Sequence, residues 1–154
     1  MARYRSITLG LALTLATACG DSSAGTTSAV LDGPVIRYPE PDTSEGGEGA
    51  SVEGRLVLDG DCLYVAGHDG GDRYPIVWPA GTSWDSASES VISPSGARMP
   101  VGSAVFGGGG THDVEYVGSS IGDDAEALVS RCVDNTYSEV AFVNNNDDAI
   151  APAG

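Results

Sequence analysis

Residues 54–66 read GRLVLDGDCLYVA, two short apolar runs on either side of an Asp-Gly dipeptide. Asp59-Gly60 suits a two-residue type I′ hairpin turn, because both central residues of that turn need a positive φ. With this turn, Leu56 is expected to face Leu63, and Leu58 to face Asp61. Side chains alternate between the two faces of a strand, so one face is apolar and collects Leu56, Leu58, Leu63 and Val65. The stretch predicts a hairpin with one face in a core.

Short apolar runs bounded by turn residues continue after this hairpin. The run YPIVW (74–78) predicts a strand, and Pro75 favours an edge position for its beginning, because proline cannot donate to a ladder. Residues 88–92 and 98–106 predict two paired strands. Between them Ser93-Pro94-Ser95-Gly96 fits a type I turn, with proline in its second position and glycine in its fourth.

The last third of the domain contains the one convincing helix. Residues 123–133, DDAEALVSRCV, have acidic residues in the first turn and Arg131 in the last, which suits the helix dipole. One face of this helix is expected to carry Ala125, Leu128, Val129 and Cys132. Strands are expected at 114–117 and 137–143, with a flexible surface loop at Gly107–Gly110. The predicted fold is mainly β, a small antiparallel barrel or sandwich with one helix before the last strand.

The flanks of this domain are polar. Residues 20–52 are rich in Ser, Gly, Pro and acidic residues, and they predict a disordered tether. The folded domain is expected at residues 53–144. Residues 145–154 predict a disordered tail. An edge strand docked on the domain is an alternative for the part of the tether that contains Val35, Ile36 and Tyr38.

The charge of the chain is strongly negative, with 22 acidic residues against 7 basic ones, all of them arginine. Arg3 and Arg5 lie in the N-terminal segment described next, so five arginines face 22 acids downstream, a formal charge of −17. Such a surface repels nucleic acid and anionic lipid. We therefore expect no nucleic-acid partner, and any attachment to a membrane must be covalent.

The N-terminus has the pattern of an export signal. Residues 1–6 (MARYRS) are basic, and residues 7–18 (ITLGLALTLATA) form an uncharged apolar run. This run is shorter than the ~20 residues that span a bilayer, but it suits the apolar region of a signal peptide. The small residues Ala16-Thr17-Ala18 then precede Cys19. Residues 1–18 are predicted to be a signal peptide.

The sequence LATAC (15–19) resembles the lipobox of bacterial lipoproteins. The resemblance implies that Cys19 receives a diacylglycerol carrying fatty acids such as palmitate, and that signal peptidase II cuts before it. The family prefers leucine where this chain has Ala16, and the leucine stands one place earlier, at Leu15. Because Ala16-Thr17-Ala18 also fits signal peptidase I, the alternative is a secreted protein. The domain loosely resembles small exported domains of unassigned function from high-GC bacteria.

The number of cysteines is odd, and Cys19 accounts for the odd one. Export places Cys62 and Cys132 in an oxidising compartment, where we expect them to form a disulfide. The alternative is two buried free thiols. Neither cysteine belongs to a C-x-x-C motif, so the spacing typical of zinc or thioredoxin sites is absent.

A serine motif is the main catalytic candidate. Gly118-Ser119-Ser120-Ile121-Gly122 fits the G-x-S-x-G nucleophile elbow of α/β-hydrolases, between a predicted strand and the helix. The chain is too short for that fold, and both histidines, His68 and His112, precede Ser120. The favoured interpretation is a Gly/Ser turn that caps a helix. A hydrolase that uses Ser120 with His112 remains the alternative.

Metal and cofactor signals are weak. His68 and His112, each beside an aspartate, could hold zinc if their loops met, and Asp59 and Asp61, or the run Asn144–Asp148, offer oxygen ligands for calcium. No EF-hand follows. Gly107–Gly110 lacks the lysine of a phosphate loop. The prediction is no metal and no cofactor, with a calcium-dependent binder as an alternative.

Aromatic side chains supply the remaining candidate site. Tyr74, Trp78 and Trp84 flank a Pro-Ala-Gly turn and could form a platform that stacks on sugars, although core positions are more usual for them. His112 is added as a speculative binding residue. The sequence therefore predicts a monomeric, non-catalytic β domain, anchored by lipid at the extracytoplasmic face of the cell membrane. There it would bind or organise an unknown envelope partner.

Overall fold

The structure is a computed structural model that describes residues 29–40, 49–67, 69, 71–133, 138–145 and 151–152. The predicted signal peptide, Cys19 and His68 lie outside the described residues, so the predictions made for them stay predictions. Where the chain is described, no helix has the length and apolar character needed to cross a membrane.

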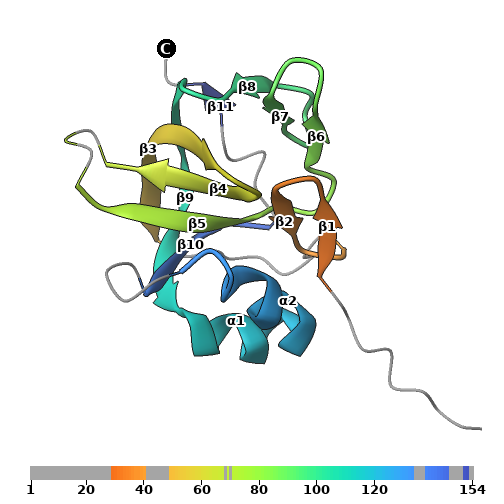
Figure 1. The fold of residues 1–154 in the computed structure, drawn as a ribbon, viewed down its shortest axis with the longest axis vertical. Coiled ribbons are helices and arrows are strands. Elements are labelled where there is room, and N and C mark those ends of the chain that lie inside the picture. Colours follow the sequence, from red (N-terminus) through yellow and green to blue (C-terminus); the bar gives the residue numbers. More distant parts are fainter. Residues whose placement is uncertain are drawn as a thin grey trace, which may run out of the picture.

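The fold is mainly β, as predicted, and its centre is a five-stranded barrel (Figure 1). The circular order of the barrel is β3-β4-β5-β10-β9 and back to β3. All neighbours are antiparallel except β5 and β10, which run parallel. Since β9 returns beside β3 after three consecutive strands, this is a Greek-key barrel, the class that includes the OB fold. The barrel strands are β3 (Ala50–Asp59), β4 (Cys62–Ala66), β5 (Arg73–Trp78), β9 (Ala104–Asp113) and β10 (Glu139–Val143).

The β3–β4 hairpin forms with the predicted apolar face but with a different turn. The two-residue loop is Gly60-Asp61, and Leu58 pairs with Leu63, so the predicted pairing of Leu56 with Leu63 is wrong. Gly60 has a φ of +61°, while Asp61 has a negative φ. Glycine with positive φ in the first position is the arrangement of a type II′ turn. The predicted face is kept, because the shift moves each pairing by two residues.

Two hydrophobic cores lie on opposite sides of the barrel wall. The inner core fills the barrel, and its largest side chain, Trp78, is 1 % exposed. The outer core lies between the wall and two helices, where Val77 of β5 and Val140 of β10 meet Val117 and Val129 of the helices. Side chains of β5 and β10 alternate between the two cores, as expected for strands buried on both faces.

The predicted loop at Gly107–Gly110 is wrong, because these glycines form the middle of β9. They pair with β3 on one side and with β10 on the other. A Cβ built on Gly109 would lie 1.9 Å from the Phe142 carbonyl oxygen and 2.9 Å from Val52 Cγ2, and φ there is +158°. Neighbouring strands approach too closely for a side chain at this position, which is a recurring reason for glycine within a strand.

A small second sheet covers one end of the barrel (Figure 1). It consists of β6 (Ser83–Asp85), β7 (Ser90–Ile92) and β8 (Arg98–Pro100). The predicted turn between β7 and β8 is present, and Gly96 N–H donates to the Ser93 carbonyl at 2.9 Å. The predicted strand 98–106 is broken at Val101-Gly102, so that β8 belongs to this sheet and β9 to the barrel. Val91 and Met99 point into the inner core.

The chain has two helices rather than the predicted one. The strand expected at 114–117 is instead the first half of α1 (Val114–Ile121), and α2 (Asp123–Val129) follows after Gly122. Asp113 caps α1 by accepting a hydrogen bond from Tyr116 N–H at 2.9 Å, which satisfies one of the free donors of the first turn. The predicted helix 123–133 is correct at its start but ends four residues early, before Cys132.

The folded part extends beyond 53–144. A hairpin of β1 (Val30–Asp32) and β2 (Val35–Arg37) lies in the predicted tether, and β2 runs parallel to β5. Val35 is fully buried, which confirms the alternative that this segment docks on the domain. β11 (Ala151–Pro152) pairs with β9 within the predicted tail. Disorder is therefore the wrong prediction for the N-terminal hairpin, because Val35 enters the inner core.

Candidate binding groove beside the β3–β4 turn

The predicted disulfide is present. Cys62 and Cys132 are joined with a Cα–Cα distance of 5.6 Å across a sequence separation of 70 residues. Cys62 begins β4, and Cys132 lies in the turn after α2, so the bond attaches the helical segment to the barrel. Next to it the Tyr64 hydroxyl donates to the Cys132 carbonyl at 2.9 Å. The prediction that Cys132 faces Cys62 is confirmed, although Cys132 follows the helix instead of belonging to it.

The disulfide forms part of a surface cavity of about 340 Å³. The cavity lies between the β3–β4 turn, the N-terminal hairpin and the end of α2. We call it the disulfide cavity, and its lining residues are Leu31, Ile36, Asp59, Asp61, Cys62, Tyr64, Leu128, Arg131 and Cys132. Leu31 is 48 % exposed, one of the few large apolar side chains left at the surface. The cavity thus combines apolar surface with both signs of charge.

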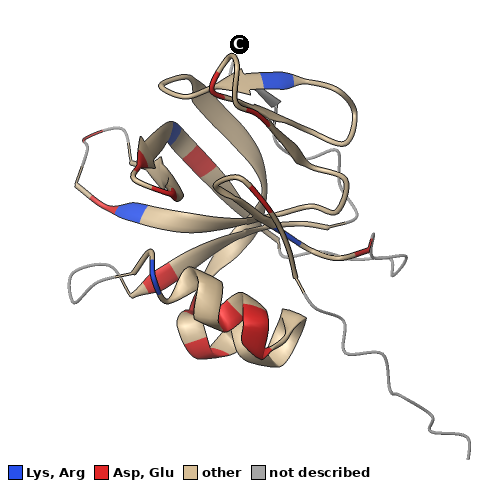
Figure 2. Cartoon of the chain, turned by 45° about the vertical axis from the view of Figure 1, so that its right-hand side comes forward, with Lys and Arg blue, Asp and Glu red and all other residues tan. Residues whose placement is uncertain are grey.

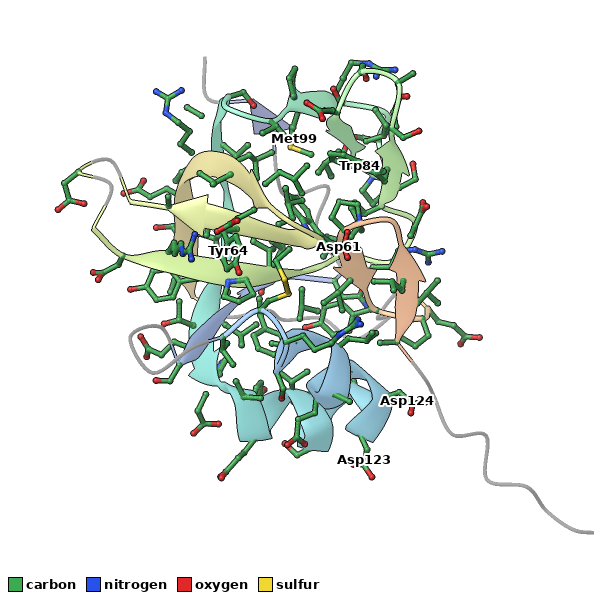
Figure 3. The ribbon with its side chains drawn as sticks, viewed as in Figure 1. Asp61, Tyr64, Trp84, Met99, Asp123 and Asp124 are labelled. Carbon is green, nitrogen blue, oxygen red and sulfur yellow. A yellow bond between two sulfur atoms is a disulfide. The ribbon has the colours of Figure 1, made fainter. Side chains whose placement is uncertain are left out.

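A second cavity, of about 350 Å³, lies on the other side of Asp61. The turn of the N-terminal hairpin, the β3–β4 turn and the small sheet enclose it. We call it the Trp84 cavity, and it is lined by Gly33, Pro34, Leu58, Gly60, Asp61, Trp84, Ser86 and Glu89. Figure 3 shows Asp61 at the end of the barrel hairpin and Trp84 on the small sheet above it. Asp61 lines both cavities, so they are neighbours at the β3–β4 turn, and we call the two together the groove.

Two of the nearby acidic residues are paired with arginine. Arg73 Nη1 lies 2.8 Å from Asp59 Oδ2, and its guanidinium lies 4.6 Å from the centre of the Tyr64 ring. Arg98 Nη1 lies 2.5 Å from Asp85 Oδ2. No further salt bridge is found within the described part of the chain. Figure 2 shows few basic residues and many more acidic ones, several of them on the helices.

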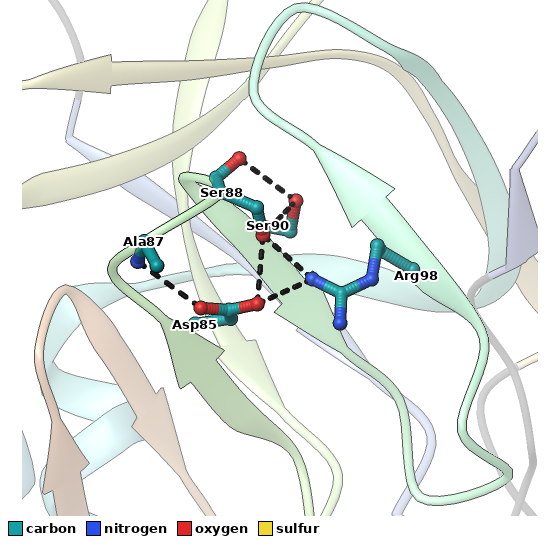
Figure 4. Close-up of polar contacts among 5 residues, drawn as sticks. All are labelled: Asp85, Ala87, Ser88, Ser90 and Arg98. Atoms are coloured by element: carbon teal, nitrogen blue, oxygen red, sulfur yellow. Dashed lines mark hydrogen bonds and ion pairs between the residues drawn. The ribbon is translucent and has the colours of Figure 1, made fainter.

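The surroundings of Asp85 lower the pKa of its carboxyl group (Figure 4). Hydrogen bonds from Arg98, from the Ser88 hydroxyl at 2.8 Å and from Ala87 N–H at 3.0 Å lower the pKa of Asp85 from 3.8 to about 2. Arg98 also donates to Ser88 Oγ at 2.6 Å. This network is exposed and fixes the β6–β7 loop, which carries Ser86 and Glu89 of the Trp84 cavity.

The three predicted platform residues do not lie together on the surface. Trp78 fills the inner core and is excluded from any surface platform. Tyr74 is half-buried against that core, and burial, followed by the charges of Asp72 and Glu139, raises its pKa above 10.0. Of the three, Trp84 alone lines a described cavity. The caution that tryptophan and tyrosine on short strands are usually core residues was correct for Trp78.

His112 lies in an aromatic cluster. Its ring stacks on Tyr116 at 3.9 Å between centroids, and the centroid of the Phe142 ring lies 5.6 Å away in a T-shaped arrangement. Ser120 is exposed in the last turn of α1. A nucleophile elbow needs a sharp turn between strand and helix, whereas Ser120 belongs to the helix itself. In the structure, Ser120 therefore lies in a helix and not in a nucleophile elbow.

Metal-binding groups are not gathered in the described part of the chain, where no cluster of three or more His, Cys, Asp or Glu side chains could hold an ion. Asp59 ends β3, Asp61 lies in the hairpin turn, and Asp59 is paired with Arg73. His68, which the zinc alternative needs, lies outside the described residues. Most of the run Asn144–Asp148 lies outside them as well.

The sequence contained signals for parts of the groove but not for the groove itself. The Asp-Gly pair indicated the hairpin turn, and Trp84 was among the aromatic candidates. The roles of Leu31, Pro34 and Glu89 depend on the docking of the N-terminal hairpin, for which the only signal was the run Val35-Ile36. Comparison with protein-family models, with curated proteins and with solved structures finds no match.

Proposed function

We propose that this protein is a cell-envelope lipoprotein. A lipid on Cys19 holds it at the extracytoplasmic face of the membrane, where its disulfide-bonded barrel binds an envelope partner without catalysing a reaction. The groove on both sides of Asp61 is the part of the domain that contacts this partner.

The observation that carries the proposal is the Cys62–Cys132 disulfide. The chain has three cysteines, so this bond leaves Cys19 without a cysteine partner in the same chain. A disulfide between residues far apart is typical of proteins that fold in an oxidising compartment. The bond thus agrees with export, and the remaining cysteine is the one that the lipobox resemblance assigns to acylation.

The distribution of charge supports covalent anchoring over adsorption. The chain downstream of residue 18 has a formal charge of −17, and anionic lipid headgroups repel such a surface. One acyl chain alone gives marginal binding, whereas a lipoprotein carries at least two. Attachment that depends on Cys19 is therefore the physically consistent way to keep this domain at a membrane.

The groove supports a binding role. Each of its cavities falls within the ~300–1,000 Å³ range of ligand pockets. Both combine apolar surface with a few charged groups. The candidate nucleophile Ser120 lies on α1 and does not line either cavity.

The test is fractionation of bacteria that express the full precursor. We expect the wild-type protein in the membrane fraction, where detergent releases it but high salt does not, and Cys19→Ser in the soluble fraction or unprocessed. The matched control, Cys62→Ser with Cys132→Ser, removes two cysteines and should remain attached. Equal attachment of a processed Cys19→Ser protein, or wild-type protein in the culture fluid with a free thiol, would contradict the proposal. The second result would favour the secreted alternative.

A further inference from the structure

The Trp84 cavity has features that specify a class of ligand. It lies where three separate parts of the chain meet: the turn of the N-terminal hairpin at Gly33-Pro34, the barrel turn at Gly60-Asp61, and the small sheet with Trp84. Pro34 and Leu58 contribute apolar surface to its lining, while Asp61 and Glu89 supply carboxylates.

Trp84 is held in place before any ligand arrives. Its backbone N–H donates to Asp32 Oδ2 at 3.1 Å, and its side chain packs against the inner core. The indole also lies so close to Gly33 that a Cβ there would be 2.6 Å from Cδ1. A ring fixed from several sides loses little conformational freedom on binding, which favours affinity.

The carboxylates of this cavity have no cationic partner in the described part of the chain. Of the arginines nearby, Arg73 is paired with Asp59 and Arg98 with Asp85. Arg131 lines the disulfide cavity on the other side of Asp61. No arginine lines the Trp84 cavity, and the molecule as a whole is strongly anionic. Two uncompensated carboxylates beside an indole attract cations and repel anions.

We infer that the Trp84 cavity binds a cationic side chain, lysine or arginine, of a basic peptide segment. The ammonium or guanidinium group would lie against the Trp84 ring, with Asp61 and Glu89 as its counter-ions. The disulfide cavity, which shares Asp61 with it, offers Leu31, Ile36 and Leu128 to a neighbouring apolar residue of the same peptide. This inference rests on the proposed function, since it names the chemistry of the partner.

A neutral sugar is the main rival, because sugars also stack on tryptophan and donate to carboxylates. The two ligands differ in their dependence on charge. Binding of a cation weakens with salt and weakens again when the amine is neutralised, whereas binding of an uncharged sugar is insensitive to salt.

The test uses purified mature protein in detergent and the blocked pentapeptide Ac-Ala-Leu-Lys-Leu-Ala-NH2, followed by calorimetry. We expect saturable binding below about 1 mM, weakened about tenfold when the lysine is acetylated. Asp61→Asn and Glu89→Gln, which alter exposed side chains, should each weaken binding several-fold. Trp84→Leu should weaken it about tenfold if it folds. Asp123→Asn, an equal charge change on α2 away from the cavity (Figure 3), should leave the affinity unchanged.

Three results would overturn the inference: no saturable binding at millimolar peptide, equal affinity for the acetylated peptide, or equal losses in Asp123→Asn and Asp61→Asn. Binding of chitotriose that is lost in Trp84→Leu and insensitive to salt, with none of the lysine peptide, would assign the cavity to sugars instead. The proposed function fails separately, because lipid attachment is measured on Cys19 and does not depend on any of these affinities.

Discussion

Removal of the Cys62–Cys132 disulfide should lower the free energy of unfolding by about 4 kcal/mol. The bond joins residues 70 apart, and in the chain-entropy model a closed loop of that length is worth about 4 kcal/mol at 25 °C. Most of the effect lies in the unfolded chain, which gains freedom when the link is absent. Small domains are stable by about 5–15 kcal/mol, so the loss is a large part of the total.

The assay is equilibrium unfolding in urea of the oxidised wild type and of Cys62→Ser with Cys132→Ser. Both cysteines are half-buried beside the disulfide cavity, so the serine hydroxyls can reach water. The midpoint for the variant should fall accordingly. Wild-type protein treated with reductant serves as the control, because its midpoint should match that of the variant. A difference below about 1 kcal/mol, or a wild-type midpoint insensitive to reductant, would refute this reasoning.

Three further predictions concern the barrel and its titratable groups. Gly109→Ala should destabilise the domain by about 3 kcal/mol or more, because its Cβ would collide with a β10 carbonyl. Gly49→Ala should change the stability by less than about 0.5 kcal/mol, because a Cβ there meets no described residue beyond its chain neighbours within 4 Å. Urea unfolding compares the two variants, and equal midpoints would contradict the strand assignment. Asp85→Asn should lower the melting temperature at pH 6, and the gap to wild type should close as the pH falls from about 4 to about 2, because the folded-state pKa of Asp85 is about 2 against 3.8 unfolded. A gap constant over that range would exclude the Arg98 contact as its cause. The raised pKa of Tyr74 means that wild type should lose stability above about pH 10, where the unfolded phenol ionises first, and Tyr74→Phe should lose less, as melting curves from pH 8 to 11 can measure.

Local signals in the sequence were sufficient for the elements that depend on neighbours in the chain. The apolar face of the β3–β4 hairpin, the turn before Gly96 and the start of α2 all follow from alternation, turn chemistry and helix charge. The pairing of Cys62 with Cys132 could be predicted because few pairings were available. These features need no knowledge of the rest of the fold.

Features that depend on distant contacts were missed. A run of four glycines indicates a loop, and only the packing of β9 between β3 and β10 explains why Gly109 occupies a strand. Val114–Val117 has the composition of a strand, yet the Asp113 cap begins a helix there. The groove at Asp61 forms only when the N-terminal hairpin docks beside β5, and no local pattern connects Leu31 or Pro34 with Trp84.

The most direct test of the proposed anchoring is the mass of the N-terminal peptide of the mature protein, purified from membranes. If the chain is a lipoprotein, this peptide begins at Cys19, and its mass exceeds that of the amino acids by a diacylglycerol with its fatty acids. An N-terminal peptide that begins at residue 19 with an unmodified thiol would contradict lipid anchoring. It would leave a secreted barrel protein in its place.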